Sequence, residues 1–238
     1  MKWASIMPKT IRANVDKQTT ERLLDAAERL FAEHGYDGVG MRALAEEAGV
    51  NLGATTYHYG SKERLYIETF MRRFRPTNAK RMELLRKAEA AANGGPVAVE
   101  VIVDCMMRPP FMTVLEHPNF PVLLGRNLFM PPPFLREVME NEVEPNHQIF
   151  AMALARALPT LPVDVLMLRM MFAGGALLMF ASQLKRLPLR GNPAICEMVL
   201  KTLVEFVAAG FRAEAAFSPK VLLPSVFGGP SGPQNGKP

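Results

Sequence analysis

Apolar and polar residues alternate along most of this chain with the period of an α-helix. Between residues 19 and 34 apolar side chains recur at positions i, i+1, i+4, i+7 and i+8, which places them on one face of a helix that begins at Thr19 or Thr20. Comparable patterns predict helices over residues 40–48, 52–59, 61–93, 96–117, 122–130, 134–158, 163–187 and 193–214. We find no strands and no internal repeats. The pattern therefore predicts an all-α fold.

Prolines fall inside three of these helices. Proline lacks a backbone N–H, and its ring clashes with the preceding turn of a helix. We therefore expect an interruption near Pro76, a disturbance at Pro109 and Pro110, and a kink at Pro145.

The stretch MRALAEEAGVNLGATTYHYGSK, from Met41 to Lys62, predicts two short helices separated by a tight turn. Gly49 follows the first helix, at a position that often requires a positive φ, which glycine adopts at little cost. Asn51 can cap the second helix through its side-chain oxygen, and Ser61 can cap the helix that follows. These signals indicate a helix-turn-helix.

The second helix of this pair, Leu52 to about Tyr59, has an unusual composition. Small residues lie in its first turn, hydroxyl and aromatic side chains follow, and no acidic residue occurs between Gly49 and Lys62. Such a helix suits the major groove of DNA, where the backbone must come close to base edges and phosphates. We therefore predict a DNA-binding head, preceded by a helix that packs beneath the pair and fixes their angle.

The run LFAEHGYDGVGMRALAEEAGVNLGATTYHYGSKERL resembles the DNA-binding head of TetR-family transcriptional regulators, over roughly residues 20–66. The resemblance implies an all-helical homodimer that binds a palindromic operator on double-stranded DNA. It also implies a larger C-terminal helical domain that dimerises, binds a small molecule and thereby releases the DNA. The DNA-binding residues that it implies are Gly40, Met41, Arg42, Asn51, Leu52, Gly53, Ala54, Thr55, Thr56, Tyr57, His58 and Lys62. Gly40 and Thr56 depart from the family pattern, because many members have a hydroxyl residue at the first position and an aromatic residue at the second.

Composition and charge are compatible with this interpretation. The chain has 238 residues, a formal net charge of +5 and a sequence pI near 9.4, which permits nucleic-acid binding. Residues 1–18 carry four basic side chains against one acidic one, which predicts a disordered arm that adds attraction to phosphates. We expect the helix-turn-helix domain over residues 19–66, the effector-binding and dimerisation domain over residues 67–217, and a disordered tail over residues 218–238. The basic run along the helix over 61–93 is either a solvated face or part of the connection that transmits motion between the domains.

The stretch from Val165 to Leu184 is apolar and about long enough to span a bilayer. Arg169 lies inside it, Gln183 lies near its end, and a second such segment is absent, so we favour a helix that is buried on all sides in a helical bundle. Cys105 and Cys196 stand in apolar contexts without CxxC spacing, which favours buried thiols in a reducing compartment. The N-terminus lacks a signal-peptide pattern. We predict a cytoplasmic protein without a membrane segment, a cofactor or a metal site.

The second domain is rich in methionine, a flexible side chain that fills irregular apolar cavities. We predict an apolar effector pocket with few polar anchors, lined by Met106, Met107, Phe111, Arg126, Phe129, Met130, His147, Phe150, Arg169 and Phe172. Arg169 needs a partner inside an apolar helix, either Glu142, Glu144 or the carboxylate of a ligand. The run LPTLPVDVLMLRMMFAGGALLMFASQLKRL is similar to the same region of a fatty-acid-responsive member of the family. The effector is therefore predicted to be a small apolar molecule such as a fatty acid or an acyl thioester.

We place the dimer interface on the last two helices. Its predicted residues are Met170, Gly174, Leu177, Val199, Leu203, Phe206, Val207 and Gly210. The histidines are scattered, and the chain contains no HExxH, GxSxG or phosphate-loop spacing, so we predict a regulator and not an enzyme. The alternative is a constitutive DNA-binding protein with a solid core and no effector.

Overall fold

The computed structural model describes residues 9–187 and 192–215, except for the side chains of residues 9–15 and of residue 185. Every regular element in these ranges is helical, which confirms the predicted all-α class. The α-helices are α1 (Lys9–His34), α2 (Met41–Glu47), α3 (Leu52–Tyr59), α4 (Lys62–Ala91), α5 (Val99–Glu116), α6 (Phe120–Phe129), α7 (Arg136–Val138), α8 (Glu144–Ala157), α9 (Val163–Ser182) and α10 (Pro193–Arg212). Short 3₁₀ helices span Pro133–Leu135 and Leu184–Arg186, and a π-helical segment spans Met139–Val143.

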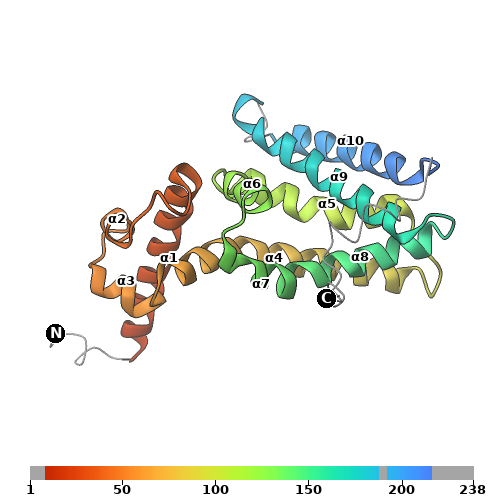
Figure 1. Cartoon of the computed structure of the whole chain (residues 1–238). Helices are drawn as coiled ribbons and strands as arrows, with labels where there is room; N and C mark the ends of the chain where they lie inside the picture. Colours follow the sequence, from red (N-terminus) through yellow and green to blue (C-terminus); the bar gives the residue numbers. More distant parts are fainter. Residues whose placement is uncertain (1–8, 188–191, 216–238) are drawn as a thin grey trace, which may run out of the picture.

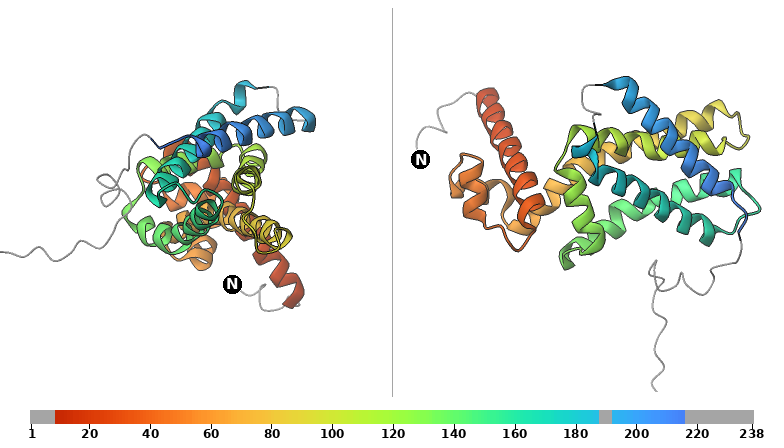
Figure 2. Two further views of the ribbon diagram at one scale, coloured as in Figure 1. Left: turned by 90° about the vertical axis from the view of Figure 1, so that its right-hand side faces the viewer. Right: turned by 90° about the horizontal axis from the view of Figure 1, so that it is seen from above.

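The helices form a small head and a larger body that share α4 (Figure 1). Helices α1 to α3 make the head, and α4 extends from it along the whole body. The body places α5 between α4 and α8 on one side and α9 and α10 on the other (Figure 2). The apolar core of the head continues into the body, because Phe31 of α1 and Leu65 of α4 belong to the same apolar cluster as Phe120 and Leu123 of α6.

Helix α1 begins at Lys9, so the predicted start at Thr19 or Thr20 is wrong. Residues 9–18 contain neither glycine nor proline, and the helix therefore continues through them. Thr20 donates its hydroxyl hydrogen to the carbonyl of Asp16 (2.9 Å), as a residue inside a helix does. Residues 9–18 of the predicted disordered arm are thus helical, while residues 1–8 and the predicted tail from residue 218 lie outside the described residues.

The prolines disturb the helices less than predicted. Helix α4 continues through Pro76, and α5 continues through Pro109 and Pro110. Each proline removes one backbone hydrogen bond, but α4 and α5 pack against each other over much of their length, which keeps both helices continuous. At Pro145 the expected irregularity takes the form of the π-helical segment, where the side-chain amide of Asn146 donates to the carbonyl of Glu142 (2.7 Å).

The prediction that the apolar helix α9 is buried on all sides is wrong. Leu166 and Ala173 face the body core, whereas Phe172 is 61% exposed and Met179 is 65% exposed. Within the described residues one helix, α9, is long and apolar enough to cross a membrane, and about a quarter of its apolar stretch is buried. The structure therefore gives α9 one covered face and one open apolar face. Cys105 is buried, as predicted, whereas Cys196 is half-buried, so the prediction of a second buried thiol is wrong.

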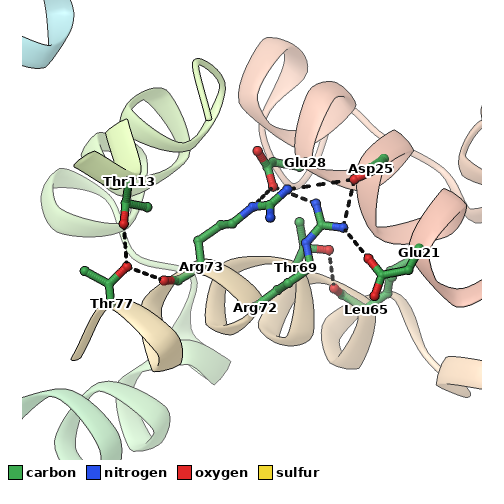
Figure 3. A network of polar contacts seen from close by, with 9 residues as sticks. All are labelled: Glu21, Asp25, Glu28, Leu65, Thr69, Arg72, Arg73, Thr77 and Thr113. Carbon is green, nitrogen blue, oxygen red and sulfur yellow. Dashed lines mark hydrogen bonds and ion pairs between the residues drawn. The ribbon is translucent and has the colours of Figure 1, made fainter. Parts of the chain in front are cut away.

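A cluster of charged side chains fixes α1 on α4 (Figure 3). Glu28 on α1 is only 5% exposed, and its Oε2 accepts hydrogen bonds from Arg72 Nη2 (2.7 Å) and Arg73 Nε (2.9 Å). Arg72 also donates to Asp25 (2.8 Å) at the exposed edge. Two guanidinium groups thus compensate one buried carboxylate, and the orientation of the head relative to α4 depends on this pairing.

We predict that Glu28→Gln lowers the free energy of unfolding by about 2–3 kcal/mol, because it leaves two partly buried guanidinium groups without their shared carboxylate. Urea-induced unfolding followed by circular dichroism measures the change. Glu21→Gln is the matched control, since the Glu21 side chain is 55% exposed and should contribute less than about 0.5 kcal/mol. Equal effects of the two substitutions would contradict the role of Glu28.

Candidate nucleic-acid interface

The turn between α2 and α3 has the backbone that its sequence predicts. Gly49 has a φ of 63°. Its N–H donates to the carbonyl of Glu46 (3.1 Å), and the N–H of Val50 donates to the carbonyl of Ala45 (2.9 Å), which together make a Schellman ending. Asn51 then caps α3, accepting a hydrogen bond on Oδ1 from the N–H of Ala54 (2.7 Å). These contacts confirm the tight turn and the cap, while Gly40 provides no side-chain cap for α2.

Helix α3 divides into an inner and an outer face. Thr55 and Tyr59, one turn apart, are buried against the head. The outer face presents Leu52, Gly53, Thr56 and Tyr57, while Ala54 and His58 are half-buried. The helix has 8 residues, about 12 Å at 1.5 Å per residue, which is comparable to the roughly 12 Å width of the major groove of DNA.

Tyr57 is the most prominent side chain of this outer face. It is 74% exposed, and its ring packs edge-on against the ring of His58 with 5.3 Å between the centroids. The contact restricts both rings without burying them. Tyr57 can therefore present its ring and hydroxyl group to a partner without a prior rearrangement of the head.

Thr55 is a correction to the predicted set of DNA-binding residues. Its side chain is fully buried, and its hydroxyl group points back toward the carbonyl of Asn51 (3.5 Å). A residue at this position of α3 fills the joint between α3 and the rest of the head, so it cannot reach a base edge from the outer face. Of the predicted residues outside α3, Gly40, Arg42 and Asn51 are exposed and Met41 is half-buried.

Lys62 has a different environment from the one predicted. Its Nζ donates to the carbonyls of Tyr36 and Val39, both at 3.1 Å, and lies 4.0 Å from the centre of the Tyr36 ring. The Tyr36 hydroxyl group in turn donates to Glu63 (2.7 Å). Burial and then the neighbouring Glu63 raise the pKa of Tyr36, and the hydrogen bond from Tyr36 lowers the pKa of Glu63. Lys62 therefore ties the loop between α1 and α2 to the start of α4.

Arg126 also contacts the head, although the sequence pattern assigns it to an effector pocket. Its guanidinium group donates to the carbonyls of Ala32 and Glu33 (both 3.2 Å) at the C-terminal end of α1. The adjacent Asn127 is buried and accepts a hydrogen bond from Tyr66 of α4 (2.6 Å). Cations are favourable at the C-terminal end of a helix, so Arg126 joins α6 to the head.

The remaining predicted effector residues do not form one pocket in the structure. Met106, Met107, Phe111 and Phe150 are buried in the body core, whereas Phe129, Met130, His147 and Phe172 are exposed. Arg169 donates to the carbonyls of Phe211 (2.8 Å) and Glu214 (3.3 Å), so the predicted pairing with Glu142 or Glu144 is wrong. An open depression of about 330 Å³ lies elsewhere, lined by Glu89, Gly94, Gly95, Pro96, Val97, Ala153 and Arg156.

The predicted dimer residues lie on both sides of α9 and α10. Met170, Leu177 and Val207 face the core of their own chain, and Val199 and Leu203 are half-buried. Gly174, Phe206 and Gly210 lie on the open side. That side also exposes Met171, Phe172, Met179 and Met198. We call this surface the α9–α10 face; it combines large apolar side chains with glycines.

Two family models match the chain. One, described as bacterial regulatory proteins of the tetR family, matches residues 23–69, and the other, described as a tetracyclin repressor-like C-terminal domain, matches residues 104–210. The HTH-type transcriptional repressor AcnR of Corynebacterium glutamicum is 37% identical over 86 residues, which is 35% of this chain and 40% of AcnR. The chain thus matches less than half the length of this relative.

Solved structures resemble the chain over most of its length. A Clostridium perfringens protein proposed to regulate fatty acid metabolism has a TM-score of 0.61 and 16% identity, covering 81% of this chain and 100% of its own. PfmR, a TetR family transcriptional regulator from Thermus thermophilus, has a TM-score of 0.57 and 21% identity, covering 79% of this chain and 97% of its own. At these identities the likeness establishes the fold.

We predict that Lys62→Ala lowers the free energy of unfolding by about 1–2 kcal/mol, since it removes a charged donor from two carbonyls. Urea-induced unfolding again measures the change. Arg64→Ala is the matched control, because Arg64 lies on the same turn of α4 and is exposed. If Lys62→Ala unfolds at the wild-type urea concentration, the contacts of Lys62 contribute nothing to the head.

Proposed function

Because this chain belongs to the TetR family of bacterial regulatory proteins, we propose that it is a transcriptional repressor that binds a palindromic operator as a homodimer. A small, mainly apolar effector releases it from the DNA. The observation that carries the proposal is the outer face of α3, which is exposed, free of acidic residues and held rigidly by a capped turn.

The outer face of α3 supports DNA binding in two ways. Gly53 and Ala54 in its first turn let the backbone come close to phosphates, while Thr56, Tyr57 and His58 offer hydrogen-bonding groups and an aromatic edge to the bases. Arg42 at the start of α2 is exposed and can pair with a phosphate. Lys62 acts mainly through the loop that it holds, so its effect on operator binding is indirect.

The α9–α10 face supports the homodimer. Monomeric proteins rarely expose such an apolar surface without a partner. A Cβ placed on Gly174, Gly175 or Gly210 would meet no described atom within 4 Å outside the backbone of its own helix, so these positions leave room for a helix of a second copy. A two-fold dimer would present two copies of α3 to half-sites about one DNA turn, roughly 34–36 Å, apart.

The joint between α6 and the head supports release by an effector. Phe120 and Leu123 of α6 share a core with the head, and Arg126 binds the end of α1. A molecule that shifts α6 or α4 therefore also shifts the head. Such a molecule releases DNA if it binds the released arrangement of the helices more tightly than the DNA-binding arrangement. The methionine-rich and apolar composition of the body favours an apolar effector.

The second candidate function is a constitutive DNA-binding protein without an effector. The depression of about 330 Å³ favours this alternative, because it is open and is lined in part by the charged side chains of Glu89 and Arg156. Release of bound DNA by a small molecule decides between the two functions.

We predict that Tyr57→Ala weakens operator binding by about ten-fold or more, since the loss of one good base contact corresponds to roughly 1–3 kcal/mol. Fragments selected from genomic DNA with the wild-type protein supply the operator, and fluorescence anisotropy measures binding. The thermal midpoint should not change, because Tyr57 is 74% exposed. Met152→Ala on α8 is the control; Met152 is 62% exposed. Wild-type operator binding by Tyr57→Ala would contradict the proposed face.

We predict that Phe206→Glu converts the dimer into a monomer, because it places a charge in the apolar α9–α10 face. Sedimentation velocity measures the mass in solution. Met152→Glu introduces the same charge on an exposed apolar position of α8 and should leave the dimer intact. A Phe206→Glu protein that remains dimeric would exclude the α9–α10 face as the interface.

A further inference from the structure

Two charged side chains are buried in the part of the chain whose side chains are described, and they differ in how their charge is balanced. Glu28 is 5% exposed and lies between two guanidinium groups. Arg81 on α4 is 8% exposed, and its one hydrogen bond within the described residues runs from Nη1 to the amide oxygen of Asn78 (2.9 Å). Its Nε is buried without a partner there. Within the described residues the charge of Glu28 is compensated, and the charge of Arg81 is not.

Side-chain contacts join α4 to the chain between Glu142 and Arg156, and two neighbouring arginines along this seam show what is missing at Arg81. Near one end, Arg75 of α4 binds both carboxylate oxygens of Glu142 at 2.8 Å. Near the other end, Arg156 of α8 pairs with Glu89 of α4. Both of these arginines are exposed and paired, whereas Arg81, between them, is buried and faces the ring of Phe150 at 4.7 Å.

A buried charge is unfavourable unless an opposite charge compensates it. Burial lowers the pKa of Arg81 to about 10, and no acidic group of residues 9–187 or 192–215 offsets this effect. The guanidinium group therefore remains charged at neutral pH. The ring of Phe150 attracts it, and the amide of Asn78 accepts one of its five N–H groups, but neither carries a negative charge.

We propose that Arg81 is the anchor for the anionic group of the effector, and that this effector is an apolar molecule with one carboxylate. The inference rests on the proposed function and names the chemical class of its ligand. The planar guanidinium group can donate two parallel hydrogen bonds to a carboxylate, and Nε is one of the donors still open. A single uncompensated cation matches a single negative charge, whereas a phosphate carries nearly two.

The surroundings of Arg81 favour an apolar tail. Phe150, Leu85 and Leu154 belong to the body core and lie on the two helices of the seam. The open depression lies on the same seam, about two turns further along α4 at Glu89. A tail that leaves Arg81 along the seam would enter between α4 and α8 and separate them. Because α4 also carries Arg72 and Arg73, such a change reaches the contacts of the head with Glu28.

The competing explanation is that Arg81 is only a packing element held by Phe150 and Asn78. The two explanations differ in what Arg81→Met does. This substitution keeps an unbranched apolar side chain about as long as arginine up to Nε, and it removes the charged guanidinium group. If Arg81 anchors a carboxylate, the variant should unfold at a higher temperature than wild type without added acid, because an uncompensated charge has been removed, and it should lose its response to the acid.

The experiment measures the thermal midpoint and the calorimetric affinity of the purified full chain with decanoate and hexadecanoate, below their micellar concentrations. Each acid is compared with its primary alcohol, and acetate and inorganic phosphate serve as anions without a tail. We expect the acids to raise the midpoint, and the alcohols, acetate and phosphate to have little effect. Arg81→Met should weaken binding of the acids by about ten-fold or more. Arg75→Met, which removes an exposed arginine of the same helix, should bind the acids as wild type does.

Equal binding of acid and alcohol by the wild-type protein would overturn the proposal, and this comparison needs no variant. Unchanged acid binding by Arg81→Met would overturn it as well, and Arg81→Gln replaces that variant if the methionine protein does not fold. The experiment distinguishes failure of the Arg81 anchor from failure of the proposed repressor function. If the acids bind through Arg81 and do not release DNA, the anchor stands and the effector role fails. If a neutral molecule releases DNA from Arg81→Met, the repressor stands and the anchor fails.

Discussion

The structure depends on the pairing of charges along α4, the helix that the head and the body share. Glu28 binds Arg72 and Arg73 where α4 crosses α1, and Glu142 binds Arg75 where α4 meets the body. The Glu28 contacts use buried or half-buried groups, and Arg75, although exposed, binds both carboxylate oxygens of Glu142, so each contact is sensitive to the relative position of the segments that carry it. A rotation of α4 that keeps one pairing strains the other, and this constraint couples the head to the body.

The same reasoning explains why the outer face of α3 is available. Thr55 and Tyr59 fill the joint beneath α3, and Lys62 and Tyr36 fix the loop between α1 and α2. With its inner face fully engaged, α3 is held in place and its outer face needs no partner within the chain. The proposed DNA contacts therefore depend on residues that do not touch DNA, and the rigidity of the head is set by its core.

The sequence predicts the local features of the fold well. The positive φ of Gly49 and the caps at Asn51 and Ser61 follow from residue chemistry within a few positions, and the structure confirms them. The errors concern features that depend on distant contacts. Helix α1 starts earlier than predicted, because residues 9–18 contain neither glycine nor proline. Helices α4 and α5 continue through their prolines because they pack on each other.

The predictions for the site residues also succeed for local features and fail for features that depend on distant contacts. Thr55 has the composition of a DNA-contacting residue, but its helical phase matches that of Tyr59, one turn later, and this phase buries it. The sequence pattern groups Arg81 with the basic residues of α4, although its spacing from Leu85 places it on the inward face. Helical phase is thus the available signal in both cases. Helical phase does not, however, predict the interaction partner of a buried side chain. Whether a carboxylate lies near Arg81 depends on which helices pack around it, and these are distant in the sequence.

A buried cation without a compensating anion among the described residues also bears on how such a protein could change state. The body is less stable than it would be with an apolar side chain at this position, and an anion that binds Arg81 would recover that stability. The recovered free energy is available only in arrangements of α4 and α8 that admit the anion. If those arrangements differ from the ones that hold Arg72 and Arg73 against Glu28, then binding at Arg81 and the position of the head oppose each other through a single helix. In that case the charged side chains of α4 have two roles. Arg72 and Arg73 hold the head in place, and Arg81 is the group on which an effector would act.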